Sequence, residues 1–115
     1  MERYALAFTV QPGTERRVAD ILGSYRRPLT HIDDHTRLLG TTVFMRGNLV
    51  VRVLDIEGAL PTVMQHLAAQ PEIQEAERQL TPYLEQPRDM TTPEGARDFF
   101  VNAMMTCVTH RIGPG

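Results

Sequence analysis

The stretch that most limits the fold is TTVFMRGNLVVRVLD, residues 41–55. Two runs of strand-forming residues flank Gly47-Asn48, and a glycine at the first of two turn positions suits a type II′ β-hairpin. The pattern therefore predicts two paired strands, over residues 38–46 and 49–56.

The two-residue turn also fixes which residues face each other, with Val43 opposite Arg52. One face of the hairpin then carries Thr41, Val43, Met45, Val50, Arg52 and Leu54. An unpaired charge in such an apolar row costs on the order of several kcal/mol. Arg52 therefore pairs with an acid (Asp33, Asp34, Asp55 or a glutamate), extends past the sheet edge, or lines a polar ligand pocket. The sequence leaves these alternatives open.

Other hydrophobic periods predict the remaining elements. Residues 3–10 alternate as a half-buried strand does, and Thr14 is a candidate N-cap for a helix that ends before Pro28. Residues 26–37 are polar and aperiodic, which predicts a loop. Three further elements are expected: a helix from Pro61 to Pro82 that is broken at Pro71, a helix over residues 94–104, and a closing strand over residues 106–112.

This order predicts an α+β fold of the ferredoxin-like, split βαβ type, with a single domain over residues 1–115. Four antiparallel strands would carry helices on one face only. Because the other face would stay uncovered, we expect a homodimer formed through the sheets.

Composition excludes several classes of protein. The chain has 115 residues and a formal net charge of −2, so no basic field suggests a nucleic-acid partner. Its one cysteine, Cys107, cannot form an internal disulfide, and no apolar signal-peptide core follows Met1. No apolar run is long enough to cross a membrane. We expect a soluble protein of the reducing cytoplasm.

Three segments carry a resemblance to a known family: RLLGTTVFMRGNLVVRVLDIEG, HLAAQPEIQEAERQLTPYLEQPRD and PEGARDFFVNAM. They resemble the SchA/CurD-like family encoded in actinobacterial gene clusters for aromatic polyketides, including spore pigments. The match runs from about Arg3 to Arg111. More distantly, the chain is similar to the tetracenomycin-type polyketide cyclases, which are dimeric α+β barrels. The resemblance implies a pocket between sheet and helices that folds a poly-β-ketone or its partly cyclised product.

Few functional residues of those cyclases carry over. Their histidine on the third strand aligns with Arg52, so the position is kept while the chemistry changes. Their His-Asp pair after the first helix falls at Tyr25-Arg26, and their second-strand arginine falls near Thr41. Neither is retained, which puts their mechanism in doubt for this chain.

Arg52 cannot act as a base, but its donors suit an enolate or a pair of 1,3-diketone oxygens. An acid or base would have to be a histidine or a carboxylate, and His66 and His110 are the histidines we place at the site. The expected substrate-binding residues are Tyr4, Thr41, Val43, Met45 and Met64. Most of these residues also have a structural explanation: His66 as a boundary residue, His110 as part of a strand near the terminus, Tyr4 as a half-buried amphipathic side chain, and Met45 and Met64 as core.

No phosphate loop, dinucleotide fingerprint or zinc-ligand spacing is present in the sequence, so we expect no cofactor and no metal. His31 and His35 flank Asp33 and Asp34, which superficially suggests a metal site. A solvated loop is the better interpretation, because the spacing matches no firm template.

Three functions fit these residues. The first is a polyketide cyclase or aromatase acting on an aromatic intermediate that an acyl carrier protein could deliver. The second is a cofactor-independent monooxygenase on such a substrate. The third is a non-catalytic module that binds the polyketide beside its synthase, which the missing His-Asp pair supports.

Overall fold

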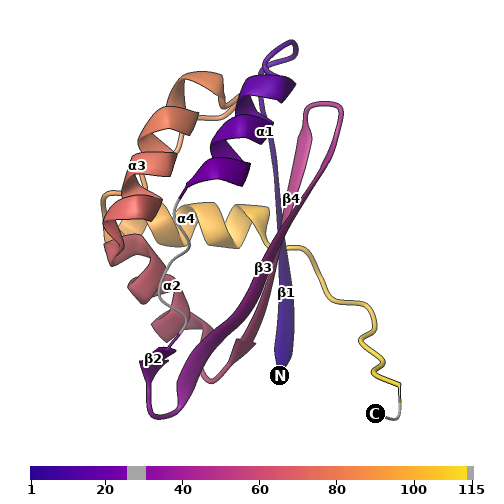
Figure 1. The fold of residues 1–115 in the computed structure, drawn as a ribbon, viewed down its shortest axis with the longest axis vertical. Coiled ribbons are helices and arrows are strands. Elements are labelled where there is room, and N and C mark those ends of the chain that lie inside the picture. The colour runs from indigo at the N-terminus through magenta and orange to yellow at the C-terminus, as the bar shows by residue number, and fades with distance from the viewer. Residues whose placement is uncertain (26–30, 114–115) are drawn as a thin grey trace.

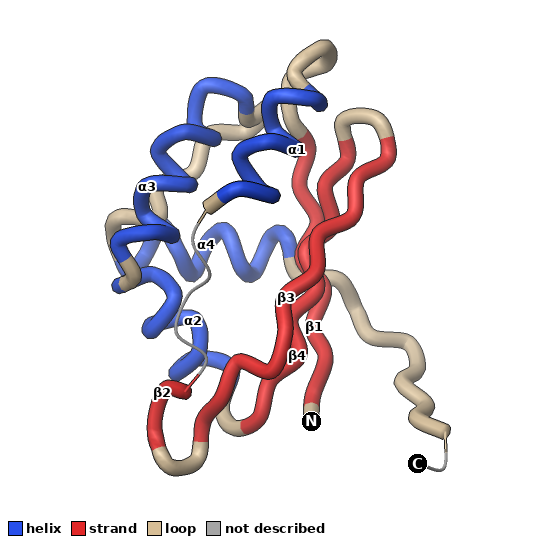
Figure 2. The backbone as a smooth tube through the Cα atoms, viewed as in Figure 1, coloured by secondary structure: helices blue, strands red, loops and turns tan. Residues whose placement is uncertain are grey.

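Four antiparallel strands form one sheet in the order β1-β4-β3-β2. The structure is a computed structural model, and it describes residues 1–25 and 31–113. Helices lie on one face of the sheet, and the C-terminal segment extends away from its other side (Figure 1, Figure 2). The strands are β1 Glu2–Thr9, β2 His31–Asp33, β3 Thr36–Arg46 and β4 Leu49–Glu57. The helices are α1 Glu15–Ser24, α2 Leu60–Ala69, α3 Pro71–Leu80, the short 3-10 helix η1 Thr81–Tyr83, and α4 Pro93–Ala103.

The central hairpin, β3 and β4, confirms the predicted register. Met45 pairs with Val50 and Val43 pairs with Arg52. Gly47 has a φ of 56°, as the first position of a type II′ turn requires. A type I′ turn would need a second positive φ at Asn48, and no described residue other than glycine has one.

The α+β, ferredoxin-like prediction is confirmed, but the fourth strand is a different segment from the one expected. It is β2, which lies within the loop predicted over residues 26–37, and β3 also begins inside that loop. Residues 26–30 of the predicted loop lie outside the described residues. The alternation in this stretch is too short to be distinguished from a polar turn, which is why the pattern predicted a loop.

The closing strand expected over residues 106–112 is wrong. Met104 forms a single bridge to Leu6, and the Met105 N–H donates to the Ala5 carbonyl at 2.8 Å, after which the chain leaves the sheet. Val108 is 91% exposed and Ile112 is 70% exposed. The alternation of apolar residues is present there, but within the described chain these side chains bury nothing that would stabilise a strand.

The core consists of two clusters between the sheet and the helices. The first contains Leu6, Leu38, Leu54, Ile56, Val63, Leu67 and Ala103. The second contains Val10, Val18, Ile21, Leu22, Val50, Leu80 and Leu84. On β4, Val50 belongs to the second cluster and Leu54 to the first, and Arg52 lies between them on the same face. The charge that interrupts the apolar row therefore stands where one cluster gives way to the other.

Candidate functional site

A cavity of about 770 Å³ lies between the helix-facing side of the sheet and the helices. β1 contributes Leu6 and Phe8 to its wall, and β4 contributes Arg52 and Leu54. Residues of α2, α3, α4 and the segment before α4 complete the lining. A cavity of this size falls in the range of small-molecule sites. It occupies the place that the sequence resemblance implied.

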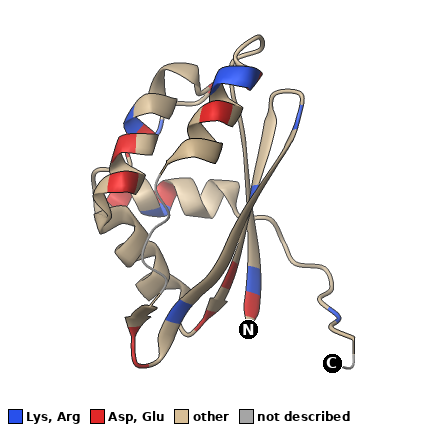
Figure 3. Cartoon of the chain, in the orientation of Figure 1, with Lys and Arg blue, Asp and Glu red and all other residues tan. Residues whose placement is uncertain are grey.

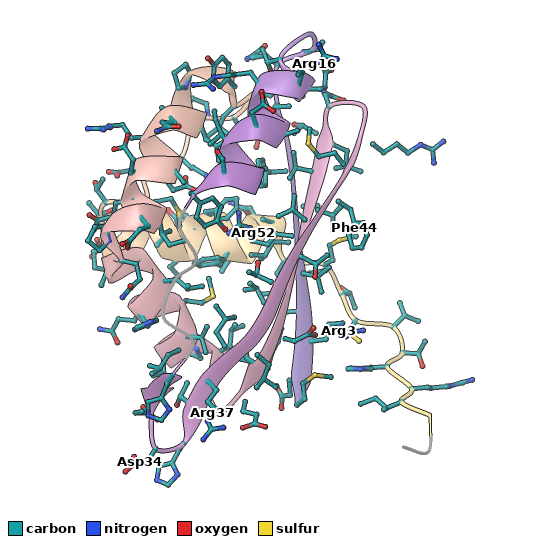
Figure 4. The ribbon with its side chains drawn as sticks, viewed as in Figure 1. Arg3, Arg16, Asp34, Arg37, Phe44 and Arg52 are labelled. Carbon is teal, nitrogen blue, oxygen red and sulfur yellow. The ribbon has the colours of Figure 1, made fainter. Side chains whose placement is uncertain are left out.

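Arg52 reaches this cavity from the middle of β4. It is half-buried, and Figure 4 places it on the helix side of the sheet, whereas Phe44 lies on the opposite side. Its guanidinium carbon lies 5.8 Å from the centre of the Tyr25 ring, a cation–π contact. Among the described residues it makes no side-chain hydrogen bond or ion pair. Asp55, one of its expected partners, faces the other side of the sheet and pairs with Arg3 at 2.6 Å.

A second arginine, Arg88, also lines the cavity, and sequence reasoning did not find it. Its Nε donates to Glu77 at 3.1 Å and its Nη2 donates to the other Glu77 oxygen at 2.7 Å. The rings of Phe8 and Phe99 lie 4.4 Å and 3.9 Å from its guanidinium carbon. Its side chain is only 8% exposed. The two residues of the ion pair are eleven positions apart in the sequence, and the pair joins α3 to a loop. No local spacing in the sequence therefore predicts it.

The lining also includes charged residues of α3, and Asp89 after Arg88. Figure 3 shows acidic and basic residues along α3. Hydrogen bonds from Arg78 and then Gln79 hold the pKa of Glu75 below its usual value. Hydrogen bonds from the hydroxyl and backbone N–H of Thr91 do the same for the pKa of Asp89. Both carboxylates therefore stay ionised at neutral pH and partly balance the arginines.

The structure brings together only part of the predicted site. Arg52 and Met64 both line the cavity. His66 is half-buried on α2, the same helix as Met64, but it is not among the lining residues. His110 is exposed on the C-terminal segment, away from the lining. The catalytic roles of these side chains stay predictions.

Four expected substrate-binding residues are not among the residues that line the cavity. Val43 and Met45 pack against the second core cluster, and Tyr4 packs against the first. The Tyr4 hydroxyl donates to Glu2, which raises the pKa of the phenol. Thr41 is exposed on β3. Their predicted contacts with substrate also stay predictions.

No group of three or more His, Cys, Asp or Glu side chains within residues 1–25 and 31–113 could hold a metal ion. None of the helices in those ranges is long and apolar enough to cross a membrane. His31 begins β2, and His35 lies in the turn that joins β2 to β3, where its N–H donates to Asp33 at 2.8 Å. That turn is thus organised by its own hydrogen bonds.

The fold and cavity define an α+β domain of the ferredoxin-like type with a ligand-sized space under its helices. Residues 1–112 match the model of the SchA/CurD-like domain. The chain belongs to this family, as its three sequence segments suggested.

Curated relatives agree with this assignment. The chain is 50% identical over 114 residues to polyketide synthase CurD of Streptomyces cyaneus, which covers 97% of this chain and 31% of that protein. It is 47% identical over 112 residues to a 42.8 kDa protein in the whiE locus of Streptomyces coelicolor, covering 97% and 28%. It is 43% identical over 108 residues to protein SchA of Streptomyces halstedii, covering 94% and 28%. The chain thus spans less than a third of the length of these relatives.

Two solved structures share the fold. Tetracenomycin F2 cyclase from Streptomyces glaucescens has a TM-score of 0.58 at 13% identity, over 99% of this chain and 100% of that one. L-rhamnose mutarotase from Formosa agariphila has a TM-score of 0.62 at 11% identity, over 97% and 100%. At these identities the likeness establishes the fold alone, because one fold hosts unrelated chemistries.

Proposed function

We propose that this domain acts in polyketide biosynthesis as a cyclase that folds an aromatic polyketide intermediate and closes one of its rings. The observation that carries the proposal is the cavity under the helices, whose mainly apolar wall includes the guanidinium of Arg52. The names of its Streptomyces relatives and of the tetracenomycin F2 cyclase support the substrate class. A planar, oxygen-rich intermediate needs such a surface: apolar area for its rings and a few placed donors for its oxygens.

Ring closure by aldol chemistry begins with loss of a proton from a methylene between two carbonyls. The resulting enolate carbon attacks a second carbonyl of the same chain, and water is then lost. Holding the chain in a folded shape supplies much of the rate by proximity. In our proposal Arg52 donates to the enolate oxygen and stabilises its charge, which a half-buried guanidinium without another hydrogen-bond partner in the described chain is placed to do.

We assign the proton transfer to His66, which precedes the lining residue Leu67 on α2. His66 is not itself among the lining residues, so it would act through a bridging water or after a movement of its side chain. Histidine is the side chain whose ordinary pKa suits this role near neutral pH. His110 lies outside the lining, so a role for it would require the cavity of a second subunit.

The test is product analysis by mass spectrometry after the purified protein is added to a minimal aromatic polyketide synthase. The wild type should change the ring pattern with loss of water, equally in air and without oxygen. Arg52→Ala and His66→Ala should restore the pattern of the synthase alone, whereas Arg46→Ala, an exposed arginine of the same hairpin, should not. An unchanged ring pattern with wild-type protein would refute the cyclase proposal, and a product one oxygen heavier only in air would replace it with a monooxygenase.

A binding module without chemistry is the second candidate function. It is favoured by one observation: no histidine is among the described residues that line the cavity. A domain of this kind would hold the nascent polyketide beside its synthase. Tight binding of the intermediate, with no change in the products, would distinguish it from the cyclase.

We also propose that the domain forms a homodimer through the uncovered face of its sheet. On that face Ala7 and Phe44 pair with Val51, and Ala5 pairs with Val53. Phe44 is 60% exposed, which is unusual for so large an apolar side chain unless it meets a partner.

Delivery of the substrate by an acyl carrier protein remains part of the proposal and is tested by comparing carrier-bound with free intermediates.

A further inference from the structure

Arg88 is held by an ion pair and by contacts with two aromatic rings. The Nε and Nη2 edge of its guanidinium is occupied by the two oxygens of Glu77. Two aromatic rings also contact the guanidinium, with the ring centres of Phe8 and Phe99 at 4.4 Å and 3.9 Å from its carbon. The two ring centres are 6.0 Å apart, so the rings meet it from neighbouring directions and not from opposite faces. Such a clamp fixes the plane of the guanidinium, since neither rotation nor displacement is possible without losing both fork hydrogen bonds.

The remaining edge of Arg88 is unsatisfied. Its Nη1 is buried and has no hydrogen-bond partner in the part of the chain that the structure describes. In a planar guanidinium that binds a carboxylate through Nε and Nη2, Nη1 is directed away from that carboxylate. Buried donors are nearly always paired, so the unpaired Nη1 of this cavity-lining residue is a candidate ligand position. Because Nη1 has almost no accessible surface, a ligand oxygen reaches it only when the side chains that cover it shift.

We propose that Arg88 is a substrate-binding residue whose Nη1 donates a hydrogen bond to a phenol, enol or ketone oxygen of a planar, oxygen-rich ring system. This inference rests on the proposed function and adds a second anchoring point to it. Arg52 and Arg88 then bind different oxygens of one substrate and fix its orientation in the cavity. Phe99 and Phe100, whose ring centres are 5.4 Å apart, form part of the apolar wall for the rings.

The chemistry of the clamp argues for such an oxygen over a phosphate or carboxylate. Glu77 already balances the charge of Arg88, so the pair presents a fixed donor rather than a net positive field. Because that charge is already matched, a neutral phenol, enol or ketone oxygen suits the remaining Nη1 donor better than a second anion does.

The test compares two probes of similar shape, 1,8-dihydroxyanthraquinone and anthracene, by fluorescence titration of the purified protein. The wild type should bind the oxygenated probe more tightly. Arg88→Met should weaken binding of that probe about tenfold or more, the effect of losing one hydrogen bond from a charged donor, and should leave anthracene binding unchanged. Arg97→Met is the matched control, since Arg97 is an exposed residue of α4 outside the cavity lining.

Removing Arg88 alone leaves Glu77 without its partner, so the fold is controlled separately. The double variant Glu77→Gln/Arg88→Met removes both charges and should show the same selective loss for the oxygenated probe. Equal loss for both probes, no loss in either variant, or no wild-type preference for the oxygenated probe would overturn the inference. The proposed function fails independently, by an unchanged ring pattern in the synthase assay with wild-type protein.

Discussion

Substituting Gly95 by alanine should destabilise the protein, although alanine is the better helix former. Gly95 is the third residue of α4, where the change gains at most about 1 kcal/mol of helix propensity. An added Cβ, however, would overlap the backbone carbonyl oxygen of Asp89 and lie 2.9 Å from its carbon. It would also lie 3.0 Å from the Thr92 hydroxyl oxygen, which caps α4 by accepting from the Gly95 N–H at 3.0 Å.

The magnitude follows from these two contacts. Forcing a backbone to shift in a packed region costs about 1–3 kcal/mol. Weakening the N-cap costs about 1 kcal/mol more. After the gain in helix propensity is subtracted, the free energy of unfolding should fall by about 1–3 kcal/mol. For a domain of this size that lowers Tm by roughly 5–15 °C.

The assay is urea denaturation followed by circular dichroism, with Gly23→Ala as the matched control. Gly23 is also in a helix, α1, but a Cβ there meets nothing within 4 Å. That variant should gain up to about 1 kcal/mol. Because Asp89 follows Arg88 in the chain, Gly95→Ala should also weaken the binding that depends on Arg88. Equal effects of the two glycine substitutions on stability would refute the reasoning.

Three further outcomes are expected. Phe44→Glu places a charge on the uncovered sheet face, so sedimentation equilibrium should show a dimeric wild type and a monomeric variant at micromolar concentration; a monomeric wild type would exclude the dimer. Glu77→Gln strands the buried Arg88 charge and should lower the free energy of unfolding by about 2–4 kcal/mol, against less than about 0.5 kcal/mol for Glu75→Gln in an exposed pair. Because the pKa of Asp89 is lowered, its stabilisation is present at neutral pH and disappears as pH falls through that pKa. Asp89→Asn should therefore melt below the wild type at about pH 7 and together with it in acid.

Local pattern predicted most of the sheet and its helices. The register of the β3–β4 hairpin follows from a two-residue turn with glycine first, and the break between α2 and α3 follows from Pro71. The two errors concern residues 26–37 and 106–112, where the outcome depends on what lies beside the segment. β2 is stabilised by pairing with the start of β3, and residues 106–112 find no such partner in the described chain, so alternation alone misjudged both.

The candidate site divides in the same way. Arg52 could be singled out from the sequence because it is the one charged residue among the five apolar-patterned positions 50–54. Arg88 could not be singled out, because its role depends on contacts with Glu77, Phe8 and Phe99. These residues come from three different elements of the fold. A buried arginine with an unpaired nitrogen is a property of the folded chain alone.

The place of Arg52 in the core explains why a charge is tolerated in that row. On β4 the two hydrophobic clusters meet at this position, with Val50 in one and Leu54 in the other. A valine there would join the clusters and increase the buried apolar surface, whereas the arginine places a charged side chain between them at the cavity wall. Because L-rhamnose mutarotase has the same fold, the architecture does not select the chemistry. In our proposal the side chains that line the cavity distinguish this domain, and the apolar burial that is lost at position 52 is the cost of placing a donor at that site.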